Sequence, residues 1–222
     1  MTKMTPIPKE KKIGRTAFRR GLTLVETLVA IGIFTMGLSG FSILFVRIWN
    51  SNSYTMEMGQ SAMAVSQGVN RIVDYLRSAR QADNGAYPIK SATENDLVVY
   101  SDYDRDGTTE RLHFYRSGQD VLMGVRNPIG TMPKTYPSGD EQTIKIAGSI
   151  MNASDEPIFE YYDGSYVGDS GQPSLDIPVD VSQVRLVKIL LRINIDPNRA
   201  PDNIEIRSFV ELRNLNDYDR ID

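Results

Sequence analysis

Three aspartates at alternate positions, Asp102, Asp104 and Asp106, are followed directly by Gly107. Hard cations such as Ca²⁺ bind carboxylate and carbonyl oxygens, and the pattern D-x-D-x-D-G is the first half of an EF-hand-like calcium loop. Three carboxylates this close repel one another unless a cation lies between them. The spacing therefore makes calcium the one cofactor that the residues suggest.

The rest of such a loop is only partly present. Thr108 is the candidate for a carbonyl ligand and Glu110 stands at the ninth position, but the twelfth position holds His113 where a bidentate glutamate belongs. The flanking residues also have the pattern of strands, not helices. The alternative is a solvated hairpin turn, in which Asp and Gly are favoured for backbone reasons alone.

The sequence gives little support for a catalytic site. His113 is the only histidine and lies in a strand pattern between Leu112 and Phe114, which favours a packed or exposed strand histidine over a catalytic base. The chain has no cysteine, so disulfides, thiol catalysis and Cys-based zinc sites are excluded. Phosphate-binding loops, zinc spacings and nucleophile elbows are also missing from the sequence. We therefore expect a protein that is not an enzyme.

A single glutamate, Glu26, interrupts the run from Leu22 to Val46, which carries no other charge over 25 residues. About 20 mostly apolar residues suffice for a helix to cross a membrane, so this run is long enough. A secretory signal fits poorly, because its apolar region has only ~7–15 residues. A plain anchor helix explains the length but not Glu26, and ionisable residues within membrane segments usually mark a function.

The basic residues gather before this run. The first 21 residues carry a charge of +6, which leaves −9 on the remainder of a chain whose net charge is −3. Because positive flanks stay in the cytoplasm, we expect residues 1–21 inside and the chain beyond Arg47 outside. The asymmetry indicates membrane topology, and nucleic acid is not an expected partner.

The stretch "RGLTLVE", Arg20 to Glu26, resembles the class III leader of type IV pilins and type II secretion pseudopilins. In that family a basic leader ends in Gly, prepilin peptidase cuts after it, the new N-terminus is methylated, and Glu stands fifth in the mature chain. The resemblance implies cleavage between Gly21 and Leu22, methylation of Leu22 and an assembly role for Glu26. One departure is Leu22, where the family usually has Phe.

The resemblance also implies partners and a location. Other pilin or pseudopilin subunits and an inner-membrane assembly platform would bind the processed chain, which would move from the cytoplasmic membrane into a pilus or pseudopilus. Cleavage would expose an α-amine on Leu22 that can neutralise Glu26 of a neighbouring subunit, since a carboxylate in low dielectric needs a cationic partner.

The spacing of the apolar residues predicts the secondary-structure elements that hold these candidate residues in place. We expect one helix over 22–81, with 22–46 in the membrane or filament core, a weak spot at 50–54, and an end before the turn residues that precede Pro88. Beyond the weak spot the apolar residues recur at spacings of three and four and predict one buried stripe. The stripe consists of Ala62, Val65, Val69, Ile72 and Leu76.

Residues 82–222 predict a β-rich head domain. Strands are expected at 96–101 and 110–116 around a turn at Gly107, then at 121–126, 143–148 and 157–162. The clearest alternation is in the last hairpin, 184–195 and 203–214. The expected fold class is α+β and pilin-like: a basic leader (1–21), a long N-terminal helix (22–81) and an antiparallel sheet domain (82–222).

The function expected from the resemblance is that of a minor structural subunit that helps to initiate or cap a type IV pilus or related filament. The head loosely resembles W-type minor pilins and J-type minor pseudopilins, so a minor pseudopilin of type II secretion is the alternative. A tip module for adhesion or DNA uptake is a further alternative, and a membrane-anchored extracytoplasmic enzyme is the alternative from a different class.

Overall fold

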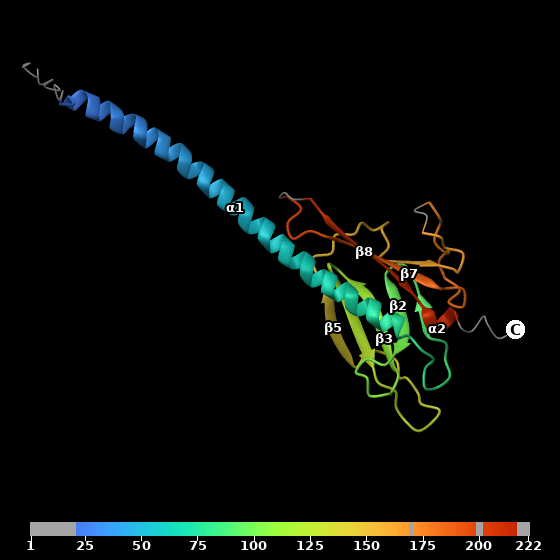
Figure 1. Cartoon of the computed structure of the whole chain (residues 1–222). Helices are drawn as coiled ribbons and strands as arrows, with labels where there is room; N and C mark the ends of the chain where they lie inside the picture. Colours follow the sequence, from blue (N-terminus) through green and yellow to red (C-terminus); the bar gives the residue numbers. More distant parts are fainter. Residues whose placement is uncertain (1–20, 169–170, 199–201, 217–222) are drawn as a thin grey trace, which may run out of the picture. The chain divides into compact units, whose positions relative to one another are not determined.

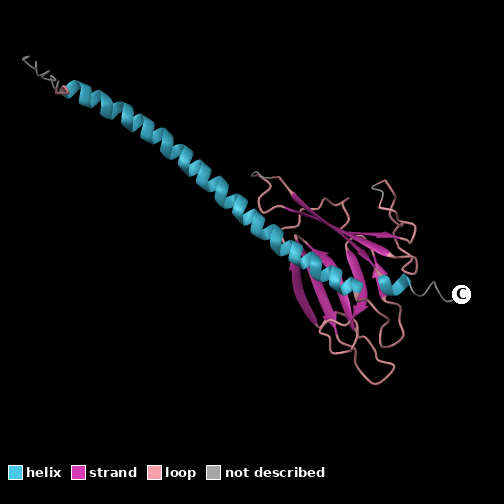
Figure 2. Cartoon of the chain, viewed as in Figure 1, coloured by secondary structure: helices cyan, strands magenta, loops and turns pink. Residues whose placement is uncertain are grey.

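The computed structural model describes residues 21–168, 171–198 and 202–216. The leader expected at residues 1–21 lies outside this range except for Gly21. The chain divides into two compact units, Met1–Asn50 and Ser51–Asp222, and the long helix α1, Leu24–Arg77, contributes to both (Figures 1 and 2). The α+β class is confirmed: a long N-terminal helix followed by antiparallel sheets.

In the second unit, α1 buries the predicted stripe. Four of its five residues, Val65, Val69, Ile72 and Leu76, are almost fully buried, whereas Ala62 at its start is half-buried. The helix is unbroken through 50–54, where a weak spot was expected, because Tyr54 is buried and its hydroxyl donates to Asn194 Oδ1 (2.9 Å).

The helix also ends at Arg77, four residues earlier than predicted. The backbone N–H of Arg80 donates to the carbonyl of Tyr100 in a neighbouring strand (2.9 Å), so it cannot continue the helical ladder. The short helix α2, Arg213–Asn216, closes this end, since Asn214 Nδ2 donates to the carbonyl of Ala79 (2.8 Å).

Five strands form an antiparallel sheet in chain order, and three more form a second antiparallel sheet. The first sheet contains β1 (Ile89–Ala92), β2 (Asp96–Ser101), β3 (Glu110–Ser117), β4 (Asp120–Arg126) and β5 (Gln142–Ala147). The second contains β6 (Phe159–Tyr162), β7 (Leu186–Ile193) and β8 (Ile204–Glu211). Only β1 was not predicted; it has four residues and a register irregularity, too short for a periodic signal.

One hydrophobic core joins α1 and the two sheets within this unit. The helix approaches β5 so closely that a Cβ on Gly68 would lie 2.2 Å from the carbonyl oxygen of Ile146, so only glycine fits there. In β7, Val187, Ile189, Leu191 and Ile193 are fully buried, as their alternation predicts. The opposite face of β2–β4 carries His113 and Arg111 next to the buried Val98 and Tyr100.

Candidate functional site

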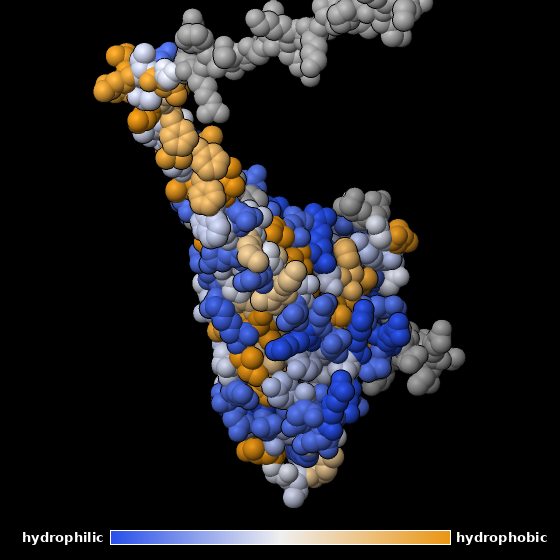
Figure 3. Space-filling view, turned by 60° about the vertical axis from the view of Figure 1, so that its left-hand side comes forward, coloured by the Kyte–Doolittle hydropathy of each residue, from blue (hydrophilic) through white to orange (hydrophobic). Residues whose placement is uncertain are grey.

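The first described part of α1 is apolar on every side. Its large apolar side chains from Leu22 to Trp49 are all more than half exposed, and Figure 3 shows this segment as a run of apolar surface. Among the described residues, α1 is the one helix long and apolar enough to cross a membrane. A helix that is apolar all round is expected to be covered by lipid or by other helices.

The hydroxyl groups in this segment are satisfied within the helix. Thr27, Thr35, Ser39 and Ser42 each donate to a backbone carbonyl three or four residues earlier, at 2.8–2.9 Å. Polar groups that leave water need such partners, because an unpaired hydroxyl in an apolar medium is costly. The segment therefore exposes hydrocarbon with almost no unsatisfied polar group along its length.

Glu26 has a local partner that the sequence interpretation did not consider. The backbone N–H and the hydroxyl of Thr23 both donate to Glu26 Oε2 (2.9 Å each), and the N–H of Glu26 donates to Thr23 Oγ1 (3.3 Å). This reciprocal pair is a capping box at the start of α1. The signal was present in the sequence as T-x-x-E before an apolar run, so Glu26 has a structural role beside any role in assembly.

Gly21 and Leu22 lie at the exposed start of the described chain. A Cβ on Gly21 would meet no atom within 4 Å, and its φ is outside the left-handed region that favours glycine. Leu22 is 76% exposed. Within the described residues, neither the packing nor the backbone requires glycine at position 21.

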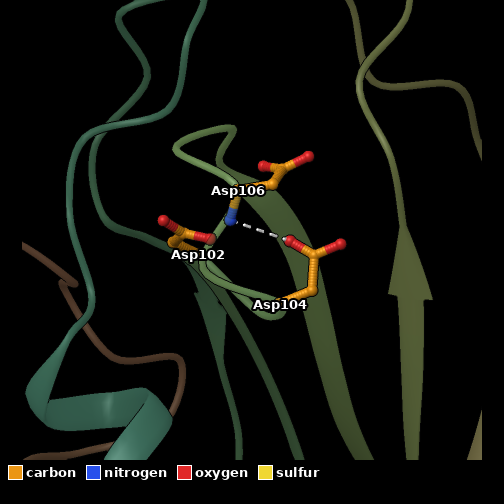
Figure 4. Close-up of side chains that lie close together, drawn as sticks. All are labelled: Asp102, Asp104 and Asp106. Carbon is orange, nitrogen blue, oxygen red and sulfur yellow. Dashed lines mark hydrogen bonds between the residues drawn. The ribbon is translucent and has the colours of Figure 1, made fainter.

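The three aspartates of the D-x-D-x-D-G pattern converge in the turn between β2 and β3. Each of Asp102, Asp104 and Asp106 offers an oxygen atom that lies within 4.8 Å of the others (Figure 4). Their carboxylates also hold the turn: Asp102 accepts from the N–H of Gly107 (3.1 Å), and Asp104 accepts from that of Asp106 (3.2 Å). Gly107 has φ +89°, which favours glycine, as the turn prediction requires.

A cation would find part of a ligand set here. The Oδ1 atom of Asp102 is buried and has no hydrogen-bond partner, whereas the two other ligands suggested by the sequence are engaged elsewhere. The carbonyl of Thr108 accepts from Arg80 Nη2 (3.0 Å), and Glu110 Oε2 accepts from the N–H of Tyr103 (2.7 Å). The three aspartates fit a divalent cation, while Thr108 and Glu110 would have to exchange partners to join it.

Arg80 is an internal cation for this turn. Its guanidinium donates to the carbonyls of Gly107 and Thr108 and to Thr109 Oγ1, and it lies 3.4 Å from Asp102 Oδ2. Such multidentate binding is characteristic of arginine. Arg80 therefore brings a positive charge to a turn that already contains Arg105 beside its three carboxylates.

Glu110 is almost fully buried beneath the turn. Burial raises its pKa above the usual value, and the charges of Asp104 and Asp106 raise it further against the opposing hydrogen bond from Tyr103. The protonated form of Glu110 is thus favoured in the folded chain relative to the unfolded one.

His113 lies between two carboxylates, which strand periodicity could not foresee. Its Nε2 is 2.5 Å from Asp96 Oδ2 and its Nδ1 is 3.0 Å from Asp140 Oδ2. The buried Arg111 contacts Asp140 Oδ1 (3.4 Å) and donates to the carbonyls of Pro137 and Gly139. This network fastens the segment before β5 to β2 and β3, which gives His113 a structural role.

Gly124 makes that network sterically feasible. It lies in β4 directly beside His113, and a Cβ on it would be 2.0 Å from Asp140 Oδ2 and 2.1 Å from Asp140 Cγ. The carboxylate of Asp140 therefore crosses β4 through the space that a side chain would fill.

Comparison with known proteins assigns no family: a scan against protein-family models finds no match, and no curated protein is significantly similar to the chain. A function for this chain therefore has to come from its own residues and their geometry.

Proposed function

We propose that this chain is a minor structural subunit of a type IV pilus or a related filament. In this proposal it is anchored in the cytoplasmic membrane with residues 1–21 inside and the β-rich head outside, until it enters the filament. The observation that carries the proposal is the exposed apolar half of α1, whose only charged residue up to Val46 is Glu26. A pseudopilus of type II secretion would use the same physical features.

Processing by prepilin peptidase is supported by Gly21. A glycine that the chain's own fold does not require is understandable if another protein must accommodate the backbone closely at that point. Seven basic residues precede it and an apolar helix follows, so the scissile bond would lie at the cytoplasmic surface of the membrane. Cleavage there would make Leu22 the new N-terminus, the site at which we propose methylation.

Glu26 would then serve two partners. Within its own chain it caps α1 through Thr23. In a filament, a carboxylate surrounded by apolar helices needs a cation, and the α-amine of Leu22 on a neighbouring subunit would supply it. A local cap and an intermolecular ion pair make different demands on the side chain, because only the second requires a negative charge.

Two substitutions separate these roles. Glu26→Gln keeps a capping box, since Gln also serves at this position, but removes the charge. Thr23→Ala removes the cap at a cost of ~1 kcal/mol and keeps the charge. We expect Glu26→Gln to abolish incorporation into filaments and Thr23→Ala to retain it.

The measurement is the fraction of the processed chain that co-purifies with sheared filaments, normalised to the amount in the membrane. Equal membrane levels of the two variants serve as the control for synthesis and processing. Normal incorporation of Glu26→Gln together with loss for Thr23→Ala would reduce Glu26 to a cap and reject the assembly role.

A further inference from the structure

A pocket of about 550 Å³ lies between the last turns of α1 and the turn that joins β2 to β3. Its lining includes Arg71 and Tyr75 from α1, and Tyr103 and Arg105 from the turn. All four belong to the compact unit Ser51–Asp222. The pocket is therefore built by two elements that the fold holds together.

Four donor groups in this pocket have no partner in the part of the chain that the structure describes. Neither the guanidinium of Arg71 nor that of Arg105 makes a hydrogen bond or an ion pair with a described residue, and the same holds for the hydroxyls of Tyr75 and Tyr103. This contrasts with the neighbouring Arg80, whose Nε and Nη2 atoms donate to the turn. Four free donor groups from two elements thus face one space.

The aromatic rings form a firm apolar side to the pocket. The Tyr75 ring lies 5.7 Å from that of Tyr103 and 6.5 Å from that of the buried Phe114, measured between centroids. Burial raises the pKa of Tyr75 and the nearby Tyr103 raises it further, while the charges of Arg71 and Arg105 oppose this shift. A ligand with a short hydrocarbon stem and an anionic end would match both features.

The charges in the pocket select the class of anion. Asp74 and Asp102 also line it, and Asp102 is already paired with Arg80. Among the lining residues, two free guanidiniums against one free carboxylate leave a single excess positive charge. Asp104 and Asp106 beside Arg105 add negative charge nearby, so a singly charged carboxylate suits the pocket better than a doubly charged phosphate. The chain outside the leader carries −9, so a nucleic-acid backbone would be repelled.

We infer that this pocket binds a carboxylate of an acidic peptide, with Arg71 and Arg105 as its two cationic clamps. Arginine binds carboxylates through paired N–H groups, and the tyrosine hydroxyls supply further donors. The carboxylate can come from an Asp or Glu side chain or from a chain terminus. This inference does not depend on the proposed filament, because it concerns the head alone.

The test uses the full chain in detergent micelles, with ¹⁵N label on the Nε atoms of arginine. Two probes are tripeptides blocked at both ends, acetyl-Gly-Glu-Gly-amide and acetyl-Gly-Gln-Gly-amide. The third is acetyl-Gly-Gly-Gly, which has a free C-terminal carboxylate, and the fourth is inorganic phosphate. We expect the Glu tripeptide to shift the Nε–H signals of Arg71 and Arg105 saturably, with a dissociation constant in the millimolar range for so small a ligand. Saturable shifts with acetyl-Gly-Gly-Gly would show that the bound carboxylate can equally come from a chain terminus.

Three variants complete the design. Arg71→Gln and Arg105→Gln should each weaken binding of the Glu tripeptide by about tenfold, observed on the remaining arginine, because each removes a charge-assisted contact. Arg77→Gln is the matched control: Arg77 is exposed on the same helix, is equally unpaired and does not line the pocket. It should leave binding unchanged.

The inference is overturned by any of three results. These are equal shifts with the Glu and Gln tripeptides, a loss in Arg77→Gln as large as in the two pocket variants, or tighter binding of phosphate than of the Glu tripeptide. Absence of any saturable shift would overturn it as well. Filament incorporation would be untouched by such a failure, since the experiment measures the isolated chain.

Discussion

Gly124→Ala should destabilise the head domain because the added methyl group would displace the side chain of Asp140. The added Cβ would lie 2.0 Å from Asp140 Oδ2, 2.1 Å from Cγ and 2.8 Å from the Cβ of Asp140, so the whole side chain must leave its place over β4. Asp140 would then lose its contacts with His113 (3.0 Å) and Arg111 (3.4 Å). Arg111 would stay buried without its counter-charge.

The size of the effect follows from these contacts. A hydrogen bond to a charged group contributes ~1.5–3 kcal/mol, and alanine in a strand is favoured over glycine by ~0.5–1 kcal/mol. The net loss should be about 1–2 kcal/mol in the free energy of unfolding. For a domain of this size that lowers the melting temperature by roughly 2–8 °C.

A double-mutant cycle tests the cause. In the background Asp140→Gly there is no side chain left to displace, so Gly124→Ala should cost nothing and gain up to ~1 kcal/mol from its strand preference. Gly59→Ala is a control for alanine itself, because a Cβ at this helical position meets nothing within 4 Å and should stabilise by ~1 kcal/mol.

The assay is urea unfolding of a fragment of residues 51–222, the second compact unit, followed by near-ultraviolet circular dichroism of its tyrosines. The coupling between the two sites is the quantity of interest. If Gly124→Ala costs the same with and without the Asp140 side chain, the crossing of β4 by this carboxylate does not stabilise the fold, and the reasoning fails.

Three further predictions concern the termini, pH and metal. Mass spectrometry should find a mature chain that starts at Leu22 with a methylated amine, and Gly21→Val should leave the precursor intact; a start beyond residue 46 would reject the pilin-like proposal. Because the pKa of Glu110 is raised in the folded chain, its contribution to stability is complete below the usual value of 4.5 and is lost as pH rises through the folded pKa. Glu110→Gln should therefore gain stability relative to the wild type as the pH rises above the usual value of 4.5, and parallel pH profiles would contradict this. If calcium binds to the aspartates with a dissociation constant of ~1 mM, a calcium concentration ten times higher should raise the free energy of unfolding by ~1.4 kcal/mol, and Asp104→Asn should remove this gain. Identical melting curves in calcium and in chelator would show that the D-x-D-x-D-G stretch is only a turn.

The strands could be predicted because their signal is local. Alternation in the last hairpin reports directly which side chains are buried, and Val187, Ile189, Leu191 and Ile193 are indeed fully buried. The turn at Gly107 is equally local, since it depends on backbone conformations that few residues adopt. The end of α1 was placed too late because the N–H of Arg80 bonds to Tyr100 in a strand about twenty residues further on, and periodicity carries no information about such a partner.

The polar contacts show the same limit. The capping box of Glu26 was readable from T-x-x-E, because its members are three residues apart. The partners of His113 are 17 and 27 residues away, and their approach depends on a missing Cβ in a third strand. Sequence spacing could suggest that His113 was not catalytic, but only the pairing of β3 with β4 could show what holds it.

Arg80 connects the two unusual features of the head. By binding the carbonyls of Gly107 and Thr108 and pairing with Asp102, it fixes the turn without a metal, while neither Asp104 nor Asp106 forms an ion pair with a described residue. The same turn carries Arg105 to the edge of the donor-lined pocket. Asp102 belongs to the aspartate cluster and also lines the pocket. A cation bound by the aspartates and a carboxylate bound in the pocket would therefore both act on the conformation of this turn. Metal and peptide binding should accordingly be measured together, because coupling between them is a direct consequence of sharing this turn.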